Sequence, residues 1–598
     1  MDTGSTPVYS TWKTLQKCDV FSIYTVYYYI GTKELITMEN TTTQVTTENM
    51  PQNTKTTAAM AVVGTILQTI NRLLEKYGLY CFAAAVLLLN YSLAFDNVVW
   101  GDEAFSGGTI YGTDLYGIFQ RIYYWDSHPP LYYYWLRLWA DIFGYTTPVY
   151  HFASLFPFTV GIVMAVTLFK KNFGTIPAAF FVLLSGLSAP CAEYNLEIRM
   201  YALVFLELLV CAWCSYFIVN NNSRKLFWIL LTLFGVAAAY THYYGLVVSG
   251  ILLFVTGLIY FLRNRGRTWL YGVIAIIAYI LLYSPWLVVF VRQTMSVGNS
   301  WWMSDIAPLN VLTELLFCGA DMRTLLMPFT IGMSLLILVI ESELLHLSLP
   351  GGSRGISWQI NKPGTGKWSK ELYGIVLFWS VIALTILFTY VASLIINPLT
   401  VARYMYPLVP MVLFILMLCI RRLLAYGKVA WGREEYGSFP EVSKSDAILL
   451  VNPKSAGWSR TVLGLVAVSF AVMLVIGLFD FKEYRSIVKT QDVETGKVLE
   501  IVGEPDKEAV FTATGVKHLS WTVLSYYYPD NQIYGDLPDE IDTDADEIWA
   551  FIGSDIFAES LENSIQQMLA KGYAVEEYKG YWMGKYGCDL YHFTKNNE

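Results

Sequence analysis

Charged residues are scarce in this chain of 598 residues. Asp, Glu, Lys and Arg make up only 15% of it, whereas an ordinary soluble domain contains about 25%. Apolar side chains make up 55% and the mean hydropathy is +0.43. This balance excludes an ordinary soluble globular protein and predicts a polytopic membrane protein.

Cysteines give no sign of a disulfide framework or a metal site. The eight of them show no paired loop spacing, because most lie inside apolar runs. The chain also lacks, at its start, the basic, apolar and small-residue pattern of a cleavable signal peptide. Residues 1 to about 56 are polar and rich in threonine. We predict a cytoplasmic N-terminal tail over residues 1–78.

Long apolar runs are abundant, and a membrane-spanning helix needs about 20 such residues. We predict eleven spans, at 79–99, 148–168, 174–191, 201–219, 226–241, 244–262, 269–290, 324–346, 371–396, 406–420 and 460–480. Basic stretches such as RNRGR (Arg263–Arg267) fall between alternate spans, so the positive-inside rule assigns them to the cytoplasm. The sequence therefore predicts an all-α polytopic protein of the plasma membrane, with its transmembrane domain over 79–480 and its C-terminus outside.

The last part of the chain, residues 481–598, differs in charge. It contains 22 acidic and 10 basic residues, a net charge of −12, whereas the remainder carries +4. Short β-rich runs such as EIWAFIG alternate with helical ones such as SLENSIQQMLAKG. We predict a small extracytoplasmic α/β domain. Its acidity excludes nucleic acid as its partner, because phosphate contacts need clustered Lys and Arg.

Polar clusters gather on one side of the predicted membrane. The outer segments contain the loop 100–147, the stretch 192–200, YTHYYG (Tyr240–Gly245), the loop 292–323 and NPLTVARYMYP (Asn397–Pro407). The spans were assigned from apolar length and Lys/Arg alone, so this coincidence points to a single external site.

Asp102 and Glu103 follow the first predicted span, at the depth where lipid headgroups begin. A carboxylate there is only partly hydrated and can act as a general base. The alternative is an acidic pair that merely marks the outer end of a helix.

Further along the same loop, Asp126 and His128 precede a rigid Pro-Pro pair, and His128 can hydrogen-bond an acceptor hydroxyl or a phosphate oxygen. A lone histidine is more often structural.

The stretch CAEYNLEIRMYAL places Glu193 and Glu197 four residues apart, so a helix would carry both on one face, with Arg199 and Tyr201 nearby. Arg199 presents a charged fork to phosphate oxygens, and Glu197 would orient it. A self-paired Glu/Arg cap is the competing interpretation.

Arg403 and Tyr404 form a second external cation site, for which interfacial snorkelling is the alternative. His242 lies in YTHYYG on the same side. Together the outer residues form a predicted cavity with a candidate base, cations for a phosphate and aromatic side chains along its walls. Such a cavity suits transfer of a sugar from a lipid phosphate with inversion at the anomeric carbon.

Four stretches resemble the GT-C membrane glycosyltransferases, specifically the dolichyl-phosphate-mannose protein mannosyltransferase and bacterial aminoarabinose-transferase-like group. They are GDEAF, DSHPPLYYYWL, EYNLEIRMYAL and ARYMYPLVP. The resemblance covers about residues 79–420. It implies the GT-C fold of about eleven transmembrane helices, an external active site, and a polyprenyl-phosphate sugar donor instead of a nucleotide sugar.

The resemblance also assigns roles to residues. It implies that Asp102 is the base and Glu103 its supporting partner. Donor phosphate binding falls to Arg199, Arg403 and Tyr404. Acceptor or sugar binding falls to Asp126, His128, Glu197, Tyr201 and His242. No cofactor is implied, and a divalent metal lacks support in the ligand spacing.

The acceptor is left open as a cell-envelope glycan, a lipid or a protein. Eukaryotic members of the group carry an extra carbohydrate-binding-like domain after the seventh span, and the loop 292–323 is too short for one, which disfavours protein O-mannosylation. The alternative function is a lipid or glycolipid transporter or flippase. Such a protein should place ionisable residues near span centres and show an internal repeat, and neither pattern is prominent here.

Overall fold

The computed structural model describes residues 52–96, 98–220, 224–263, 269–300, 326–341, 345–348, 357–360, 368–395, 402–426, 456–515, 519–553 and 556–595. The chain divides into two compact units, Met1–Gly78 and Leu79–Glu598. The first 51 residues of the predicted tail lie outside the described residues, and helix α2 begins at Gln52. The second unit contains the candidate site.

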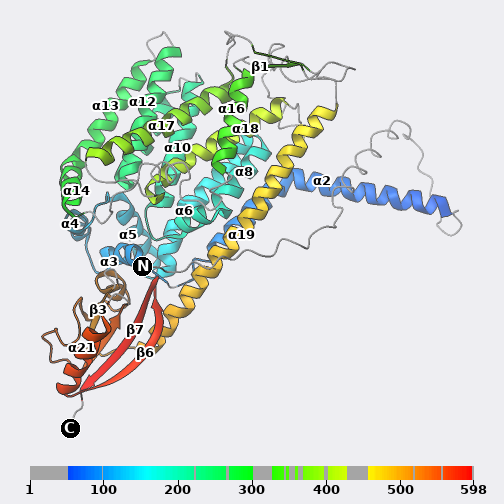
Figure 1. The fold of residues 1–598 in the computed structure, drawn as a ribbon. Coiled ribbons are helices and arrows are strands. Elements are labelled where there is room, and N and C mark those ends of the chain that lie inside the picture. The colour runs from blue at the N-terminus through cyan, green and yellow to red at the C-terminus, as the bar shows by residue number, and fades with distance from the viewer. Residues whose placement is uncertain are drawn as a thin grey trace. The chain divides into compact units, whose positions relative to one another are not determined.

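Helices make up most of the chain, as Figure 1 shows. They are α2 (Gln52–Tyr91), α3 (Gly101–Ile110), α4 (Leu115–Trp125), α5 (Leu131–Phe143), α6 (Thr147–Met164), α7 (Lys170–Phe173), α8 (Thr175–Leu187), α9 (Ala189–Leu196), α10 (Tyr201–Val219), α11 (Lys225–Thr241), α12 (Tyr243–Arg263), α13 (Leu270–Tyr283), α14 (Leu287–Ser300), α16 (Leu326–Glu341), α17 (Lys370–Ile395), α18 (Val409–Tyr426) and α19 (Ala456–Val502).

The membrane helices confirm the predicted fold class. Among the described residues, eight helices are long and apolar enough to cross a membrane, and the bent pair α8 and α9 passes the same test of length and composition when the two helices are taken together. Two shorter apolar helices, Lys225–Thr241 and Pro328–Val339, coincide with the other two predicted spans. In α10 and α18, 78% and 72% of the apolar window is buried, against 28% in Leu270–Ser296. The first two therefore form the core, and the last presents apolar side chains outward for lipid.

Three predicted boundaries are wrong. The first span was placed at 79–99, but helix α2 ends at Tyr91, because the apolar residues after it fold into a turn in which Val99 is fully buried. The span at 174–191 is broken, since α8 and α9 meet at a bend of 66°. The span at 324–346 is too long: α16 ends at Glu341, and Leu345–Ser348 (β1) pairs with Ser357–Ile360 (β2) in an antiparallel hairpin.

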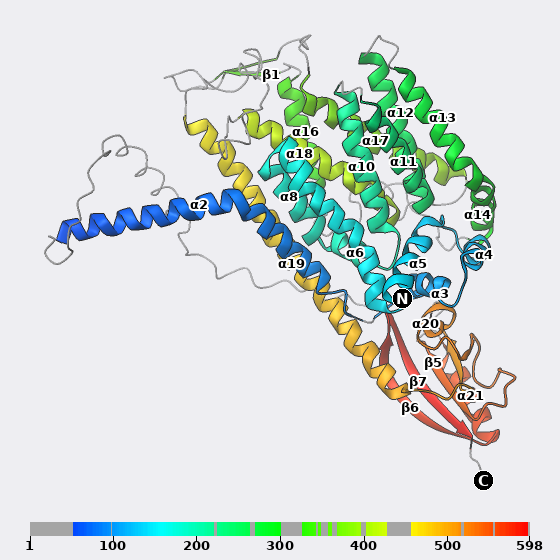
Figure 2. The same cartoon turned by 180° about the vertical axis from the view of Figure 1, so that it is seen from behind.

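The C-terminal part contains the predicted mixture of strands and helices. Its strands are β3 (Val510–Thr514), β4 (Gln532–Tyr534), β5 (Glu547–Ile552), β6 (Tyr573–Met583) and β7 (Tyr586–Lys595), in the sheet order β4-β3-β5-β7-β6. Strand β3 is parallel to its neighbours β4 and β5, while β7 is antiparallel to β5 and β6. Helix α21 (Ala558–Ala570) covers part of the sheet, as Figure 2 shows from behind. Strand β4 was not predicted, and residues 481–502 continue α19 without a break.

The β6–β7 hairpin ends against the chain segment that leads into α3. Its loop consists of two residues, Gly584 and Lys585, because Met583 pairs with Tyr586. The Tyr586 hydroxyl accepts a hydrogen bond from Gly101 N at 3.2 Å. A Cβ on Gly584, which has φ of +63°, would lie 2.5 Å from the Val99 carbonyl oxygen, so only glycine fits there. The hairpin thus approaches the backbone just before Asp102.

Candidate active site

Helix α3 begins with a carboxylate cap. Trp100 N donates to Glu103 Oε2 at 3.1 Å, and acidic side chains in a first turn also interact favourably with the helix dipole. The other oxygen of Glu103 accepts from Ile198 N at 3.0 Å. Glu103 is therefore buried and bonded to two backbone segments, the start of α3 and the break between α9 and α10. This geometry makes it a positioning residue.

The segment from Glu197 to Met200 interrupts the helices α9 and α10. Helix α9 ends at Leu196, and Glu197 takes an extended conformation with ψ of 133°. Glu197 N still donates to Glu193 O at 2.9 Å, so Glu197 caps the helix that carries Glu193 and lies one turn along from it. Because the chain turns here, Arg199 points back toward α3, and Arg199 N bonds Glu197 O at 2.6 Å.

Arg199 connects three elements. Its guanidinium donates to the Ser106 hydroxyl of α3 at 3.2 Å and to the Tyr133 hydroxyl of α5 at 3.3 Å, and it lies 3.3 Å from His128 Nδ1. The side chain is only 3% exposed. A buried arginine that satisfies several acceptors organises their positions. Among the described residues, the Arg199 guanidinium makes no hydrogen bond to the Glu197 carboxylate, which was expected to orient it.

Asp126 and His128 form one hydrogen-bonded group after α4. Asp126 Oδ1 lies 2.9 Å from His128 Nδ1, and Oδ2 accepts from the Tyr133 hydroxyl at 2.5 Å. Burial raises the pKa of the Asp126 carboxyl, but the His128 ring, Arg199 and the Tyr133 hydroxyl outweigh burial and hold this pKa below its ordinary value. Asp126 therefore remains ionised and fixes the His128 ring.

Asp102 meets Arg403 across 301 residues of sequence, with Arg403 Nη1 at 3.1 Å from Asp102 Oδ2. The two side chains are 27% and 25% exposed, so the carboxylate is held by an ion pair and still reaches solvent. The Arg403 guanidinium also lies 5.8 Å from the centre of the Trp100 ring and 5.5 Å from that of Tyr404. The loop after the first span and the segment before α18 therefore build one site.

Aromatic rings join these polar groups. His242, at the end of α11, has its ring centre 5.8 Å from that of His128, 5.9 Å from that of Tyr201 and 5.9 Å from that of Tyr404. All ten residues proposed from sequence thus lie in one connected group: Asp102, Glu103, Asp126, His128, Glu197, Arg199, Tyr201, His242, Arg403 and Tyr404.

Glu197 accepts a hydrogen bond at 2.8 Å from the indole N–H of Trp100, the residue that precedes α3. Burial raises the pKa of Glu197 well above its ordinary value, and the negative charge of the nearby Glu103 carboxylate raises it further. Glu197 Oε2, Arg199 Nε and His242 Nε2 are buried and make no hydrogen bond within the described structure. Such polar atoms are costly and concentrate at functional sites.

Sequence reasoning missed Trp100, Ser106 and Tyr133, which bond to the predicted residues. All three lie beside motif residues, so their proximity in sequence was an available signal. Lys585 and Tyr586 also reach this region, and nothing in the sequence around them indicated it.

Metal ligands are not gathered here. Within the described part of the chain, no group of three or more His, Cys, Asp or Glu side chains could hold a metal ion.

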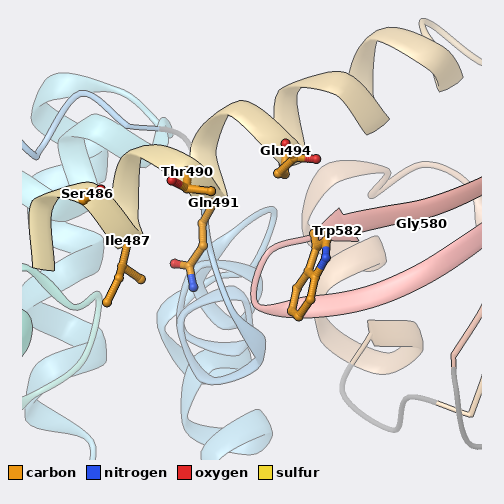
Figure 3. Close-up of a pocket in the computed structure, with 7 residues that line it drawn as sticks. All are labelled: Ser486, Ile487, Thr490, Gln491, Glu494, Gly580 and Trp582. Carbon is orange, nitrogen blue, oxygen red and sulfur yellow. The ribbon is translucent and has the colours of Figure 1, made fainter. Parts of the chain in front are cut away.

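Two pockets lie close to the site without containing Asp102. One, of about 790 Å³, is lined by residues of α3, α4 and α6 and by Tyr526 and Tyr527 of the C-terminal part, and its aromatic rings can stack on a sugar ring. The other, of about 480 Å³, lies between α19 and β6, and Figure 3 shows Gln491 and Trp582 lining it. None of the ten predicted residues lines either pocket.

No protein-family model matches the sequence, and no curated protein matches it. Among solved structures, ArnT from Cupriavidus metallidurans in the apo state is similar over 86% of this chain and 98% of its own, with a TM-score of 0.52 and 12% sequence identity. The chain has the fold of ArnT.

Two further structures are similar at lower scores. ArnT bound to undecaprenyl phosphate has a TM-score of 0.49 and 12% identity, over 86% of this chain and 98% of its own. An Archaeoglobus fulgidus oligosaccharyltransferase in complex with zinc and sulfate has a TM-score of 0.38 and 10% identity, over 84% and 73%. The ArnT fold confirms the GT-C fold expected from the four motifs, and at 12% identity the likeness concerns the fold alone.

Proposed function

We propose that this protein is an inverting glycosyltransferase that moves a sugar from a polyprenyl-phosphate donor to an acceptor outside the cytoplasm. The single observation that carries the proposal is the ion pair between Asp102 and Arg403, because a carboxylate and a guanidinium in one site suit the roles of general base and phosphate-binding cation. The ArnT fold supports it, since ArnT has been crystallised with undecaprenyl phosphate.

The proposed chemistry divides the work between these two side chains. Asp102 accepts the proton of the acceptor hydroxyl or amine as that atom attacks the anomeric carbon. Arg403 stabilises the negative charge that develops on the departing polyprenyl phosphate. Attack and departure occur on opposite faces of the sugar, so its anomeric configuration inverts. Asp126 and Arg199 hold His128 beside this centre, where its ring can contact the acceptor. We propose no metal for this reaction.

A panel of donors tests the proposal. Membranes containing the protein, and matched membranes without it, would be incubated with polyprenyl-phosphate sugars, and the envelope glycans would be analysed by mass spectrometry. We expect one donor to add its sugar only where the protein is present. A donor that crosses the bilayer unchanged in a protein-dependent way would favour the flippase alternative.

The orientation of the protein is a further part of the proposal. We expect residues near 224 and 421 in the cytoplasm, and Asp102 and the domain after 481 outside, because basic loops alternate with spans. Cysteines introduced at Lys225 and Ser560, in a background in which Cys18, Cys81 and Cys318 are replaced by serine, should differ in labelling. In intact cells an impermeant thiol reagent should modify only the Ser560→Cys variant. Protection of that variant in intact cells would contradict the eleven-span count.

Arg403→Lys should raise the donor KM about 10-fold, because lysine keeps the charge and loses the bidentate fork that fits a phosphate. A matched control is Arg292→Lys, since Arg292 also stacks on an aromatic ring, that of Tyr123 at 3.8 Å, and lies outside the site. Its donor KM should stay at the wild-type value. An unchanged donor KM in Arg403→Lys would indicate an interfacial anchor.

A further inference from the structure

Lys585 is a cation that the C-terminal domain brings to the catalytic side of the membrane domain. It is the second residue of the two-residue loop between β6 and β7. Its Nζ lies 5.0 Å from the centre of the Trp100 ring, and the Arg403 guanidinium lies 5.8 Å from the same ring. Two cations that are far apart in the sequence therefore both lie near the ring of Trp100, the residue that precedes α3.

The C-terminal domain docks through contacts that do not involve the lysine side chain, one of them from Tyr527, outside the hairpin. The Tyr586 and Tyr527 hydroxyls accept hydrogen bonds from Gly101 N and Val99 N, each at 3.2 Å. Gly584 N donates to the Thr495 hydroxyl of α19 at 3.0 Å. These contacts hold the backbone of the loop in place, so docking of the domain does not require a charge at position 585.

The ion pair of Lys585 is weak. Its Nζ is 3.6 Å from Glu193 Oε1, well beyond the length of about 2.8 Å that a charge-assisted hydrogen bond takes. The two side chains are 39% and 41% exposed, and exposed pairs of this kind contribute little to stability. The ammonium group therefore has hydrogen-bonding capacity left for a ligand.

The other two cations of the site are already engaged. Arg199 is buried and bonds α3 and α5, and Arg403 is paired with Asp102. The phosphodiester of the donor has two free oxygens that share one negative charge, and the phosphate gains a second charge as the sugar departs, so a second, accessible cation binds it better. Lys585 is partly exposed and lies over the same indole as Arg403, which meets this need.

We propose that Lys585 binds the phosphate of the donor together with Arg403, so that the C-terminal domain completes the donor site. This inference rests on the proposed glycosyl transfer. Lys585 supplies a hydrogen bond and a positive charge to a phosphate oxygen, and no covalent step passes through it. The domain then acts as part of the enzyme, and its hairpin sets the affinity for the donor.

The test uses the full-length protein and three substitutions. Lys585→Met keeps the length of the side chain and removes its charge, and Lys585→Arg keeps the charge. Lys579→Met is the matched control, because Lys579 is on the same hairpin, is 64% exposed and pairs with Glu577 at 2.7 Å. Donor KM, acceptor KM and thermal unfolding temperature would be measured for each variant.

We expect Lys585→Met to raise the donor KM about 10- to 100-fold, the effect of losing one hydrogen bond to a charged group. The unfolding temperature should stay unchanged, and Lys585→Arg and Lys579→Met should remain near wild type. An unchanged donor KM, a rise confined to the acceptor KM, or a loss explained by a lower unfolding temperature would each overturn the inference. An inactive wild-type protein would instead refute the proposed transfer.

Discussion

Asp102→Asn should lower turnover about 10²–10⁴-fold, the usual effect of removing a general base. Asparagine keeps the size of the side chain and can still accept a hydrogen bond from Arg403, but it cannot take the proton of the acceptor. Folding and donor binding should therefore be largely preserved. The measurement is the transfer rate of the purified protein at saturating donor, combined with a donor-binding assay.

Asp114→Asn is a matched control for this prediction. Asp114 is an exposed carboxylate in the same external loop, where it caps α4 through a hydrogen bond from Gly117 N. Asparagine is an equally good helix cap, so turnover should not change. Glu103→Gln should cost less turnover than Asp102→Asn, and its main effect should be on stability, because Glu103 accepts from two backbone N–H groups. Near-normal turnover in Asp102→Asn would reduce Asp102 to a marker of the helix end.

Arg199→Met should destabilise the fold by about 3–5 kcal/mol and abolish transfer, because it leaves buried acceptors and the Asp126 carboxylate without their cation. The stability and the transfer rate of Arg199→Lys should lie between those of Arg199→Met and wild type. One ammonium group cannot reach Ser106 of α3 and Tyr133 of α5 together. Thermal unfolding followed by tryptophan fluorescence, with transfer measured on the folded protein, separates the two effects.

Arg137→Lys is the control for Arg199. Arg137 pairs with Asp141 one turn along α5, and the two side chains are 20% and 47% exposed. An exposed pair of this kind contributes little to stability, so its loss should hardly move the unfolding temperature. If Arg137→Lys and Arg199→Lys lowered the unfolding temperature by the same amount, Arg199 would not organise the site.

The sequence was sufficient to predict the fold class and to select ten side chains that the structure brings into one connected group. Apolar length and charge gave eleven spans, and each overlaps an apolar helix. The ten candidate residues stood out because polar groups at the ends of apolar segments are expensive unless they have a function. The count of spans also predicted that these residues lie on one side of the membrane.

What the sequence did not reveal was how individual side chains pair. The bend between α8 and α9 could not be inferred from periodicity, because the apolar run continues through it. Glu103 was predicted to support the base and Glu197 to orient Arg199 and bind acceptor or sugar, whereas the structure bonds one to backbone N–H groups and the other to Trp100. Lys585 lies 483 positions after Asp102, and only tertiary packing brings its hairpin to α3.

Release of polyprenyl phosphate by the purified protein in detergent tests the central claim most directly. Detergent micelles remove the two separate membrane faces, so transport alone produces no chemical change. With its donor and acceptor present, the wild-type protein should release polyprenyl phosphate in equal amount to the sugar transferred, with inverted anomeric configuration, and Asp102→Asn should release almost none. Recovery of every donor intact despite measurable binding would contradict the account.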